Sequence, residues 1–533
     1  MSLPKSLFGV ASAFTFMAFS IGCSSSGQPL RGNGGTGNGG KDSGGASAAG
    51  GTNPATNSGG SNDAGSSAPA LDAAVTTDAG KPGTCTPSNY VCPTASGVVD
   101  TDCDVLDFGA AGDGLNDDTC AVQAALDYCG QVAKCHSTIA TVHVPPGTYL
   151  LMPLILRSNV TFQLDGSASA TDGGVDVADG GGSEGLVRLQ FVPDPMAYPA
   201  SGGLPITPAF INGNGVTNVA ITGHGVIDGA GAQWWSLFTS TWSPASQDPR
   251  PYLVSFTNNS SNLTLSGVTL QNSPKFHLFF QNCSNIDVHG ITIRAPSNSP
   301  NTDGIDPKSC THVRISDCDI STGDDNVAIT SNSRTGFAPP TSNDTEVYNC
   351  RFGAGHGVSI GSPTYGDVGG MNVHDCTFNG TQNGIRIKSN ATSGGLVDGI
   401  IYNNLQMTKV TNVIVLDEYY SDKPSIPPLT GDAGAPPPVS PNEPEFRNIH
   451  ISNINATDCG SAGIIRGRAE SPIYNVFLDN VNIASSKGMT IRFAQNIQFT
   501  NSTIVTPAGV APLTLQVDPS EVTGIGSMLD AGP

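Results

Sequence analysis

Two short segments place three aspartates beside glycines and apolar residues. "SPNTDGIDPKSC" contains Asp303, and "STGDDNVAIT" contains Asp324 and Asp325. Aspartates in such segments can be ordinary turn residues, calcium ligands, or a paired general acid and base. Which of the three applies depends on the residues that the fold brings to them.

Two further segments carry a histidine and two cations. His356 lies in "GAGHGVSIGS", and Arg386 and Lys388 lie in "NGIRIKS". Both cations alternate with isoleucines, so strand geometry places them on the same side. Asp303 and Asp325 are 22 residues apart, and His356 and Arg386 follow after 31 and 30 residues, each roughly one further repeat. If each interval is one structural repeat, all of these side chains converge on one cleft.

A repeated β-type pattern sets the expected fold. Runs such as "NLTLSGVTLQN", "NIDVHGITIRA" and "HVRISDCDIST" start at Asn262, Asn285 and His312, which are separated by 23 and 27 residues. Short strands recurring at this period indicate a solenoid, and helix-length segments for a doubly wound α/β fold are missing. We therefore predict an all-β, right-handed parallel β-helix. "DDTCAVQAALDYCG" (117–130) is the expected N-terminal capping helix.

The N-terminal part of the chain resembles an export leader followed by a tether. Residues 1–23 have a short positive start, an apolar stretch and "SIGC", as in a bacterial lipoprotein signal in which Cys23 would be lipidated. Ordinary cleavage and secretion is the alternative. Residues 24–80 have too few large apolar residues to order themselves. The β-helix domain is expected at 101–525, with a Pro-rich insert at 423–445, in a protein that we expect to be a monomer.

The charge balance limits the partners. The formal net charge is −21 and only 13% of residues are charged. Such an acidic chain is not expected to bind nucleic acid through its phosphates. An acidic polymer would be repelled at long range, so binding it requires a local basic patch.

The cysteines indicate an oxidising compartment. Of the thirteen cysteines, twelve remain if Cys23 is set aside, and an even number in an exported chain suggests disulfides. We expect Cys318, Cys350 and Cys376, which share one slot of the repeat, to form a buried column of free thiols. Six cysteines crowd the N-terminal edge of the domain: Cys85, Cys92, Cys103, Cys120, Cys129 and Cys135.

Four of these segments together resemble a known family. "NTDGID", "GDDNVAI", "GHGVSIGS" and "GIRIK" are similar to the signature segments of glycoside hydrolase family 28, the polygalacturonases and their relatives, in the family's order. The likeness extends from "DFGAAGDGLNDDTCAVQAAL" to "GIIRGRAESPI", most of the chain beyond residue 100. It implies inverting hydrolysis of α-1,4-galacturonosyl bonds in galacturonan, an acidic plant cell-wall polysaccharide, without a cofactor or a metal.

The resemblance also implies a role for each catalytic residue. Asp324 would be the general acid, and Asp303 and Asp325 would hold and deprotonate the attacking water. His356 would tune the protonation of the acid. Mutual repulsion among clustered carboxylates is expected to raise at least one pKa.

The substrate-binding residues follow from the same likeness. Arg386 and Lys388 would bind the substrate carboxylate on the leaving-group side. Tyr420 matches a substrate-contacting tyrosine, although the neighbouring Tyr419 leaves the register open. Many relatives have cysteines where this chain has Asn326 and Phe352, which places the chain near the bacterial branch, where exo-action is frequent.

Several alternatives remain open at this point. Rhamnogalacturonan or xylogalacturonan could be the substrate, a calcium-dependent pectate lyase shares the β-helix, and a surface β-helix could bind sugars without catalysis. Six residues have both a structural and a functional interpretation: Trp234, Trp235, His277, Lys308, Arg466 and Arg468.

Overall fold

The computed structural model describes one part of the chain in detail. The described residues are 100–167, 185–198, 200–201, 204–205, 208–237, 248–332, 341–421 and 442–526. The expected signal peptide, the tether, Cys85, Cys92 and most of the 423–445 insert lie outside these residues. Contacts divide the chain into two units, Met1–Val75 and Thr76–Pro533, and every described residue belongs to the second. Across the described residues, no helix has the length and apolarity needed to cross a bilayer.

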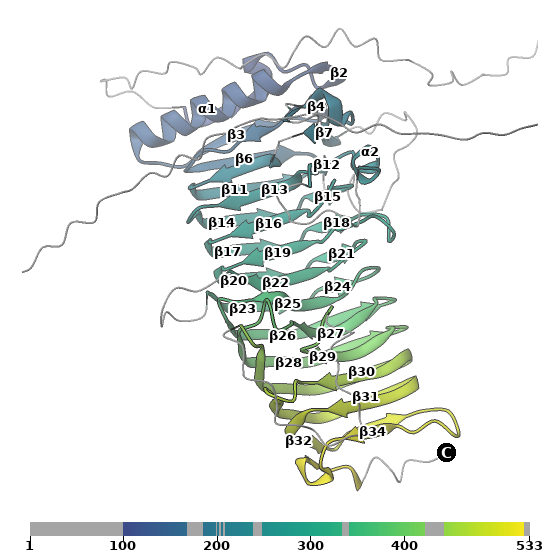
Figure 1. The fold of residues 1–533 in the computed structure, drawn as a ribbon. Helices are drawn as coiled ribbons and strands as arrows, with labels where there is room; N and C mark the ends of the chain where they lie inside the picture. The colour runs from purple at the N-terminus through teal and green to yellow at the C-terminus, as the bar shows by residue number, and fades with distance from the viewer. Residues whose placement is uncertain are drawn as a thin grey trace, which may run out of the picture. The chain divides into compact units, whose positions relative to one another are not determined.

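The fold is the predicted right-handed parallel β-helix (Figure 1). Among the described residues, 33 strands join one parallel-paired system. In one series β17 (Ser284–His289) pairs with β14 (Ser261–Ser266) before it and β20 (Thr311–Ser316) after it. Ile286 lies opposite both Leu263 and Val313. The repeat recognised in the sequence is therefore one coil, and successive coils stack in register.

Each coil contributes strands to three series, and long strands in the later coils take part in more than one. The first series consists of β1 (Asp102–Asp104), β3 (Ala140–Val144), β6 (Val160–Asp165), β11 (Thr217–His224), β14, β17, β20, β23 (Ser342–Tyr348), β26 (Val368–Asn379), β28 (Leu396–Thr408), β30 (Glu445–Arg466), β31 (Ile473–Arg492), β32 (Ala494–Thr500) and β35 (Val522–Thr523). The second series consists of β5 (Leu154–Ile155), β10 (Ala209–Asn214), β13 (Tyr252–Thr257), β16 (Leu278–Gln281), β19 (Ile305–Lys308), β22 (Val327–Ser331), β25 (Val358–Thr364), β27 (Asn383–Lys388), β29 (Asn412–Asp417), the last parts of β30 and β31, and β34 (Leu513–Gln516). The third series contains β2 (Asp113–Asp117), β4 (Gly147–Leu151), β7 (Val187–Phe191), β12 (Val226–Asp228), β15 (Thr269–Gln271), β18 (Thr292–Arg294), β21 (Asp319–Ser321), β24 (Arg351–Phe352) and β33 (Thr503–Val505). The remaining elements are η1 (Val105–Phe108), α1 (Thr119–His136), η3 (Pro195–Ala197), β8 (Ala200–Ser201), β9 (Leu204–Pro205), α2 (Ala232–Trp235) and η6 (Pro519–Glu521).

Asparagines at the corners explain how the coils turn. Asn218, Asn262 and Asn285 have φ of 55°, 56° and 55°, a left-handed conformation that asparagine tolerates better than most residues. Their side chains also form a ladder, in which Asn262 donates to Asn218 at 2.8 Å and Asn285 donates to Asn262 at 2.9 Å. An asparagine at the start of each of these β-type runs thus forms both the turn and the hydrogen bond between adjacent turns.

The interior of the coils is an apolar column. Strand alternation turns every second residue inward, and Leu263, Ile286 and Val313 are each 1% exposed. Removing such side chains from water is the main favourable contribution to stacking. At the N-terminal end, α1 closes this column (Figure 1) with buried Val122 and Leu126. The helix begins at Thr119 and continues beyond the predicted end at residue 130 to His136, with Gly130 in its interior, and it ends where Ser137 adopts a left-handed conformation with φ of 51°.

The cysteines divide as expected between the cap and the core. Cys103 and Cys129 form a disulfide between β1 and α1, with Cα atoms 6.3 Å apart, and two further cap cysteines, Cys120 and Cys135, are also disulfide-bonded. The predicted thiol column is confirmed: the three cysteines are buried and free. Disulfides therefore fasten the cap, while core cysteines behave as small apolar residues.

The later coils differ from the short strands expected from the sequence. β30 runs for 22 residues, and β26, β28 and β31 are also long. Left-handed residues lie inside these strands, for example Asp375, Asn404 and Asn453. They turn the corner while pairing with the adjacent coil continues, so one strand serves more than one series.

Candidate active site

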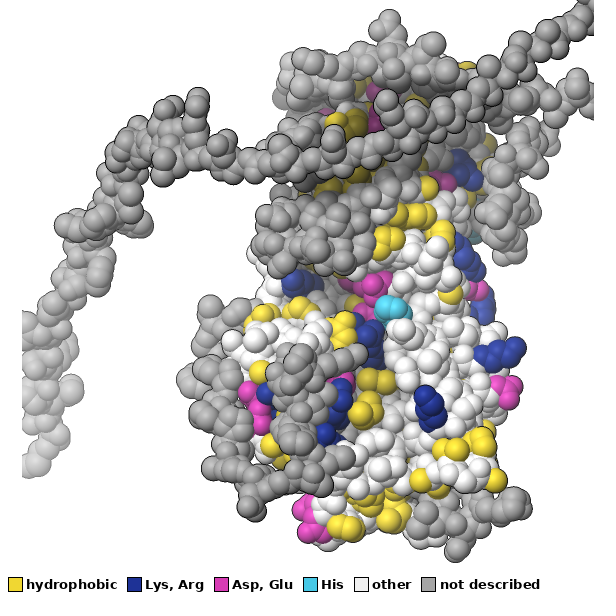
Figure 2. All heavy atoms as spheres, turned by 45° about the vertical axis from the view of Figure 1, so that its right-hand side comes forward, with side chains coloured by type: hydrophobic (Ala, Val, Ile, Leu, Met, Phe, Trp, Pro, Cys, Tyr) yellow, Lys and Arg dark blue, Asp and Glu magenta, His cyan; other side chains and the backbone are white. Residues whose placement is uncertain are grey.

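The second series brings the predicted catalytic residues together on adjacent coils. Asp303 precedes β19, Asp324 and Asp325 precede β22, and His356 precedes β25. Backbone bonds fix their relative heights: the N–H of Gly304 donates to the carbonyl of Asp325 at 2.9 Å, and the N–H of His356 donates to the carbonyl of Asp324 at 2.9 Å. Acidic, basic and histidine side chains gather in a hollow on this side of the molecule (Figure 2).

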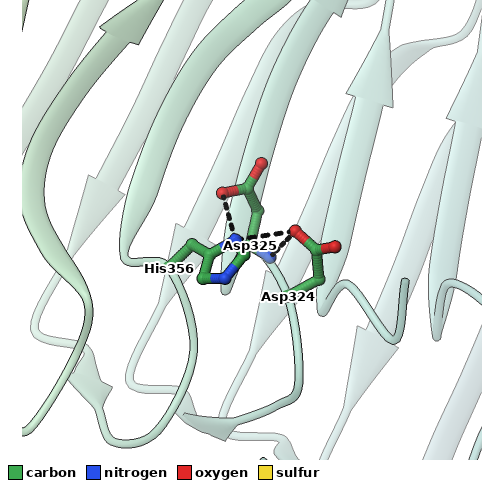
Figure 3. A group of neighbouring side chains, drawn as sticks. All are labelled: Asp324, Asp325 and His356. Atoms are coloured by element: carbon green, nitrogen blue, oxygen red, sulfur yellow. Dashed lines mark hydrogen bonds and ion pairs between the residues drawn. The ribbon is translucent and has the colours of Figure 1, made fainter. Parts of the chain in front are cut away.

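The imidazole of His356 lies between two carboxylates (Figure 3). Its Nδ1 is 2.9 Å from Asp324 Oδ1 and 3.8 Å from Asp325 Oδ1. Asp324 Oδ1 also accepts the backbone N–H of Asp325 at 2.9 Å, and Oδ2 accepts Asn301 Nδ2 at 3.3 Å. Asp324 is the more exposed of the two carboxylates, with 23% side-chain exposure against 4% for Asp325, so it is the one that a ligand in the hollow can reach.

Asp325 is held by the two predicted substrate-binding cations. Arg386 Nη1 donates to Oδ1 at 2.9 Å, Lys388 Nζ donates to Oδ2 at 2.7 Å, and Ser359 Oγ donates to Oδ1 at 2.7 Å. Burial acts to raise the pKa of Asp325, but Lys388 and Arg386 outweigh it and the pKa is lowered. This carboxylate is therefore kept ionised although it is almost fully buried.

A second pair of carboxylates has the opposite electrostatics. Asp303 and Asp306 are 6% and 5% exposed, and within the described residues the Oδ1 atom of each has no hydrogen-bond partner. Burial, followed by repulsion from neighbouring aspartates, raises the pKa of both well above the usual range. The expected pKa rise within the cluster thus occurs at Asp303 and Asp306. Asp306 was missed by the sequence analysis, although its alternation with the buried Ile305 would have placed it outward.

The structure places Tyr420 beside the cations. Its ring centre is 5.5 Å from Arg386 Cζ and 5.2 Å from Lys388 Nζ, a cation–π geometry. Tyr419 is 1% exposed and packs instead against Arg468, at 4.4 Å from its ring centre. Tyr420 is therefore the tyrosine that borders the hollow.

Asn326, which stands where the resemblance implies a cysteine in many relatives, joins the Asp325 and His356 loops. Asn326 is fully buried, and its Nδ2 donates to the carbonyl of Ala354 at 2.9 Å while its Oδ1 accepts the N–H of Gly357 at 2.8 Å. Phe352 packs on Phe378, with ring centres 4.9 Å apart. The Asp325 and His356 loops are thus tied by amide hydrogen bonds in place of a covalent bridge.

His277 and the two tryptophans have structural surroundings. His277 is fully buried, its Nδ1 lies 2.9 Å from the carbonyl of Asp303, and its Nε2 accepts the N–H of Ser273 at 3.4 Å. Burial lowers the pKa of His277 to about 4, so this neutral imidazole supports the backbone of Asp303. Trp234 is fully buried, and Trp235 donates to the carbonyl of Ser273 at 3.0 Å.

The other candidate cations are already engaged or partly desolvated. Arg466 makes two bonds to Asp417, at 2.9 and 2.6 Å. Arg468 pairs with Glu470 at 2.8 Å. The structural interpretation of Lys308 is a solvated charge, but the side chain is partly buried, and burial lowers its pKa. None of these cations takes the place of Arg386 and Lys388 beside the aspartates.

Asp324, Asp325 and His356 could also hold a metal ion, since their ligand atoms lie within 4.8 Å of one another. Calcium prefers six to eight oxygen ligands, whereas this group offers two carboxylates and a nitrogen. Asp325 already carries two cationic partners, which repel a further cation. The donor set therefore fits proton chemistry better than metal binding.

Residues 135–506, which include this entire cluster, match the sequence profile of Glycosyl hydrolases family 28. The chain belongs to this family. An endo-polygalacturonase of Pectobacterium carotovorum subsp. carotovorum is 32% identical over 390 residues, 70% of this chain and 86% of the relative. One from Pectobacterium parmentieri is 36% identical over 292 residues, 53% of this chain and 67% of the relative.

Solved structures agree with this membership. The polygalacturonase from Erwinia carotovora ssp. carotovora superposes with a TM-score of 0.56 at 26% identity, covering 82% of this chain and 100% of that structure. An exopolygalacturonase from Thermotoga maritima gives 0.60 at 22% identity, covering 76% and 93%, which supports the fold. The predicted family, fold and enzyme class, a glycoside hydrolase, are therefore confirmed.

The electrostatics of this family 28 site predict that Asp306 costs stability. Because the pKa of Asp306 in the folded state is raised above the ordinary 3.8, the protonated form of Asp306 favours the folded state. This favourable contribution to the free energy of unfolding is fully present below pH 3.8 and is lost as the pH rises through the folded-state pKa. Asp306→Asn cannot ionise. We expect it to raise the free energy of unfolding at pH 7 by roughly 1–3 kcal/mol, with little effect near pH 3.5, in urea titrations.

The matched control is Asp228→Asn. Asp228 is equally buried, at 5% exposure, but it is paired with Arg188 at 2.8 Å. Removing the negative charge of Asp228 would break this ion pair and should therefore destabilise the protein. If Asp306→Asn were destabilising at pH 7 as well, the raised pKa of Asp306 would be wrong.

Proposed function

We propose that the chain hydrolyses α-1,4-galacturonosyl bonds of pectic galacturonan with inversion of the anomeric centre. One observation carries this proposal: two carboxylates and a histidine lie directly beside a pair of cations, Arg386 and Lys388. Carboxylates supply the acid and the base for glycoside hydrolysis. The cations supply the local positive charge that an acidic substrate needs in a chain of net charge −21.

Asp324 is the general acid in this proposal. Its exposed side chain reaches the hollow, and its 2.9 Å contact with His356 Nδ1 lets the imidazole influence where the proton resides. The proton passes from Asp324 to the glycosidic oxygen as the bond to the anomeric carbon breaks. The leaving sugar keeps this proton as its new hydroxyl.

Asp325 and Asp303 bind and activate the water. Asp325 is ionised and can accept a proton, whereas Asp303, with its raised pKa, is suited to orient the water through a hydrogen bond. The water oxygen attacks from the face opposite the leaving group, and its proton goes to Asp325. Asp324 and Asp325 have exchanged their protonation states at the end, so proton exchange with solvent restores both.

Arg386 and Lys388 have two tasks in this scheme. They keep the buried Asp325 ionised, and their remaining N–H groups can bind the carboxylate of the sugar on the leaving-group side. The ring of Tyr420 covers both cations and can pack against that sugar. A neutral sugar at this position would leave the remaining N–H groups of the two cations without an anionic partner from the substrate, which favours galacturonate over rhamnose.

The decisive experiment uses de-esterified polygalacturonate in the presence of a chelator. Wild-type protein should release new reducing ends without the ultraviolet absorbance of unsaturated products, and proton NMR should detect the inverted anomer first. Product lengths separate exo-action, with monomer from the start, from endo-action. Absorbance that requires calcium would instead identify a lyase. Hydrolysis of rhamnogalacturonan alone would reassign the substrate.

Asp324→Asn should lower kcat by about two to four orders of magnitude, because the proton donor is lost. Binding of oligogalacturonide, measured by calorimetry, should change little, since the cations remain. A variant that retained near-normal kcat would show that another residue is the acid.

Lys388→Met tests the double role of the cations. With Lys388 removed, burial dominates and raises the pKa of Asp325, so the acidic limb of kcat/KM against pH should move up by about one pH unit or more. KM should also rise. Lys134→Met, on the distant cap helix, is the control. A raised KM with an unmoved acidic limb would mean that Asp325 is not the base.

We also propose that the chain is exported and lipidated at Cys23. The disulfide-bonded cysteines of the cap support export, because disulfides persist in oxidising compartments. Labelled palmitate should be incorporated into the wild-type chain and not into Cys23→Ala. Equal labelling of both would contradict lipidation at this position.

A further inference from the structure

A groove lies beyond the catalytic cluster on the same series of strands. It is a hollow of about 430 Å³ formed by β29, β30, β31 and the segment leading into β34. Its lining includes two half-buried apolar side chains and several polar ones: Val415, Ile464, Asn412, Ser461, Lys487 and Thr490. No catalytic role assigned above involves these residues.

Strand register joins the floor of this groove to the active site. Arg386 on β27 lies opposite Val415 on β29, which lies opposite Ile464 on β30, which lies opposite Thr490 on β31. These residues alternate with fully buried neighbours and therefore share the outer face. One continuous row thus runs from the cation pair into the groove, and Figure 2 shows apolar side chains continuing along this side of the molecule from the charged cluster.

A second row runs parallel to the first. Asn383, whose Nδ2 donates to the carbonyl of His356 at 3.3 Å, lies opposite Asn412, followed by Ser461 and then Lys487. Lys487 is exposed and lies three strand spacings from β27, which is about 14 Å at ~4.8 Å per strand. The groove is bounded by a polar row that ends in a cation and by a row with apolar side chains.

We propose that this groove is a distal subsite for the leaving-group end of a galacturonan chain, centred on Lys487. The inference rests on the proposed function, because Arg386 and Lys388 fix the direction in which the chain leaves the aspartates. Neighbouring strands lie about 4.8 Å apart, and the proposal places one sugar of a stretched pyranose chain on each strand. The sugars that follow the one bound by the cation pair therefore reach Val415 and Ile464, and a carboxylate roughly three sugars along reaches Lys487.

The chemistry of the lining fits this occupant. The apolar face of a pyranose ring can pack on Val415 and Ile464, and the Thr490 hydroxyl can bond sugar hydroxyls. The Lys487 ammonium attracts a carboxylate, and as an exposed charge it contributes modestly and in a salt-dependent way. The site thus selects unesterified galacturonan that is several sugars long.

The test compares full-length wild type with Lys487→Met on galacturonate oligomers of defined length. Dimers and trimers end before Lys487, so their kcat/KM should change less than about twofold. For pentamers and hexamers, KM should rise about threefold to tenfold at low salt, with kcat retained. The difference should shrink in high salt. Lys134→Met on the cap helix is the matched control and should behave as wild type at every length.

A second variant tests the groove independently of Lys487. Ile464→Glu puts a like charge on the floor of the groove and should penalise only the long oligomers, while thermal unfolding reports whether the fold is intact. Equal effects of the variants on dimers and hexamers, or no effect of either variant at any length, would overturn the subsite. If wild type cleaves no galacturonate oligomer, the proposed function itself fails and the subsite fails with it.

Discussion

In-register pairing between successive coils is the constraint on which the site depends. Each strand must satisfy its backbone groups with the strand before it and the strand after it, so matching positions of consecutive coils stand about 4.8 Å apart. The bonds from Gly304 to Asp325 and from His356 to Asp324 belong to this pairing. Side chains from segments more than fifty residues apart, such as Asp303 and His356, are thereby brought to the same part of the molecule, and Asn326 adds hydrogen bonds between adjacent loops.

Burying several aspartates close together costs electrostatic free energy, and this cost differs from one aspartate to another. Asp325 receives both cations and a serine hydroxyl, whereas Asp303 and Asp306 are buried, each with an oxygen that has no partner among the described residues. The pKa of the first is lowered and the pKa values of the other two are raised. Pushing neighbouring pKa values apart is how one site keeps a proton acceptor and protonated carboxyls at the same pH. The free energy of folding that the buried carboxylates cost is offset by the packing of the apolar column and by the hydrogen bonds of the asparagine ladders.

The sequence predicted the parts of this arrangement that repeat. Apolar alternation and the intervals between Asn262, Asn285 and His312 defined the coil, and the four motifs located Asp303, Asp324, Asp325, His356, Arg386 and Lys388 on it. What depends on side-chain contacts between coils could not be predicted. The pairing of both cations with Asp325 was not foreseen, since they were expected to serve the substrate. The bridging role of Asn326 and the burial of Asp306 likewise follow from packing, which no single segment encodes. The resemblance indicated Tyr420, and packing distinguishes it from Tyr419.

The alternation of outward and inward residues along each strand allows the lining of the groove to change without a change in the fold. Outward positions such as Val415, Ile464 and Thr490 form a row that begins at Arg386, while the residues between them, such as Ile414 and Ile465, fill the core. A substitution in the outward row changes the lining of the proposed subsite and leaves the column of inward side chains intact. Near the aspartates this separation does not hold, because Asp325 and Lys388 belong to the candidate site and are nevertheless almost fully buried. There a substitution of Lys388 also changes a desolvated ion pair, so the proposed first subsite can be altered only together with the proposed base.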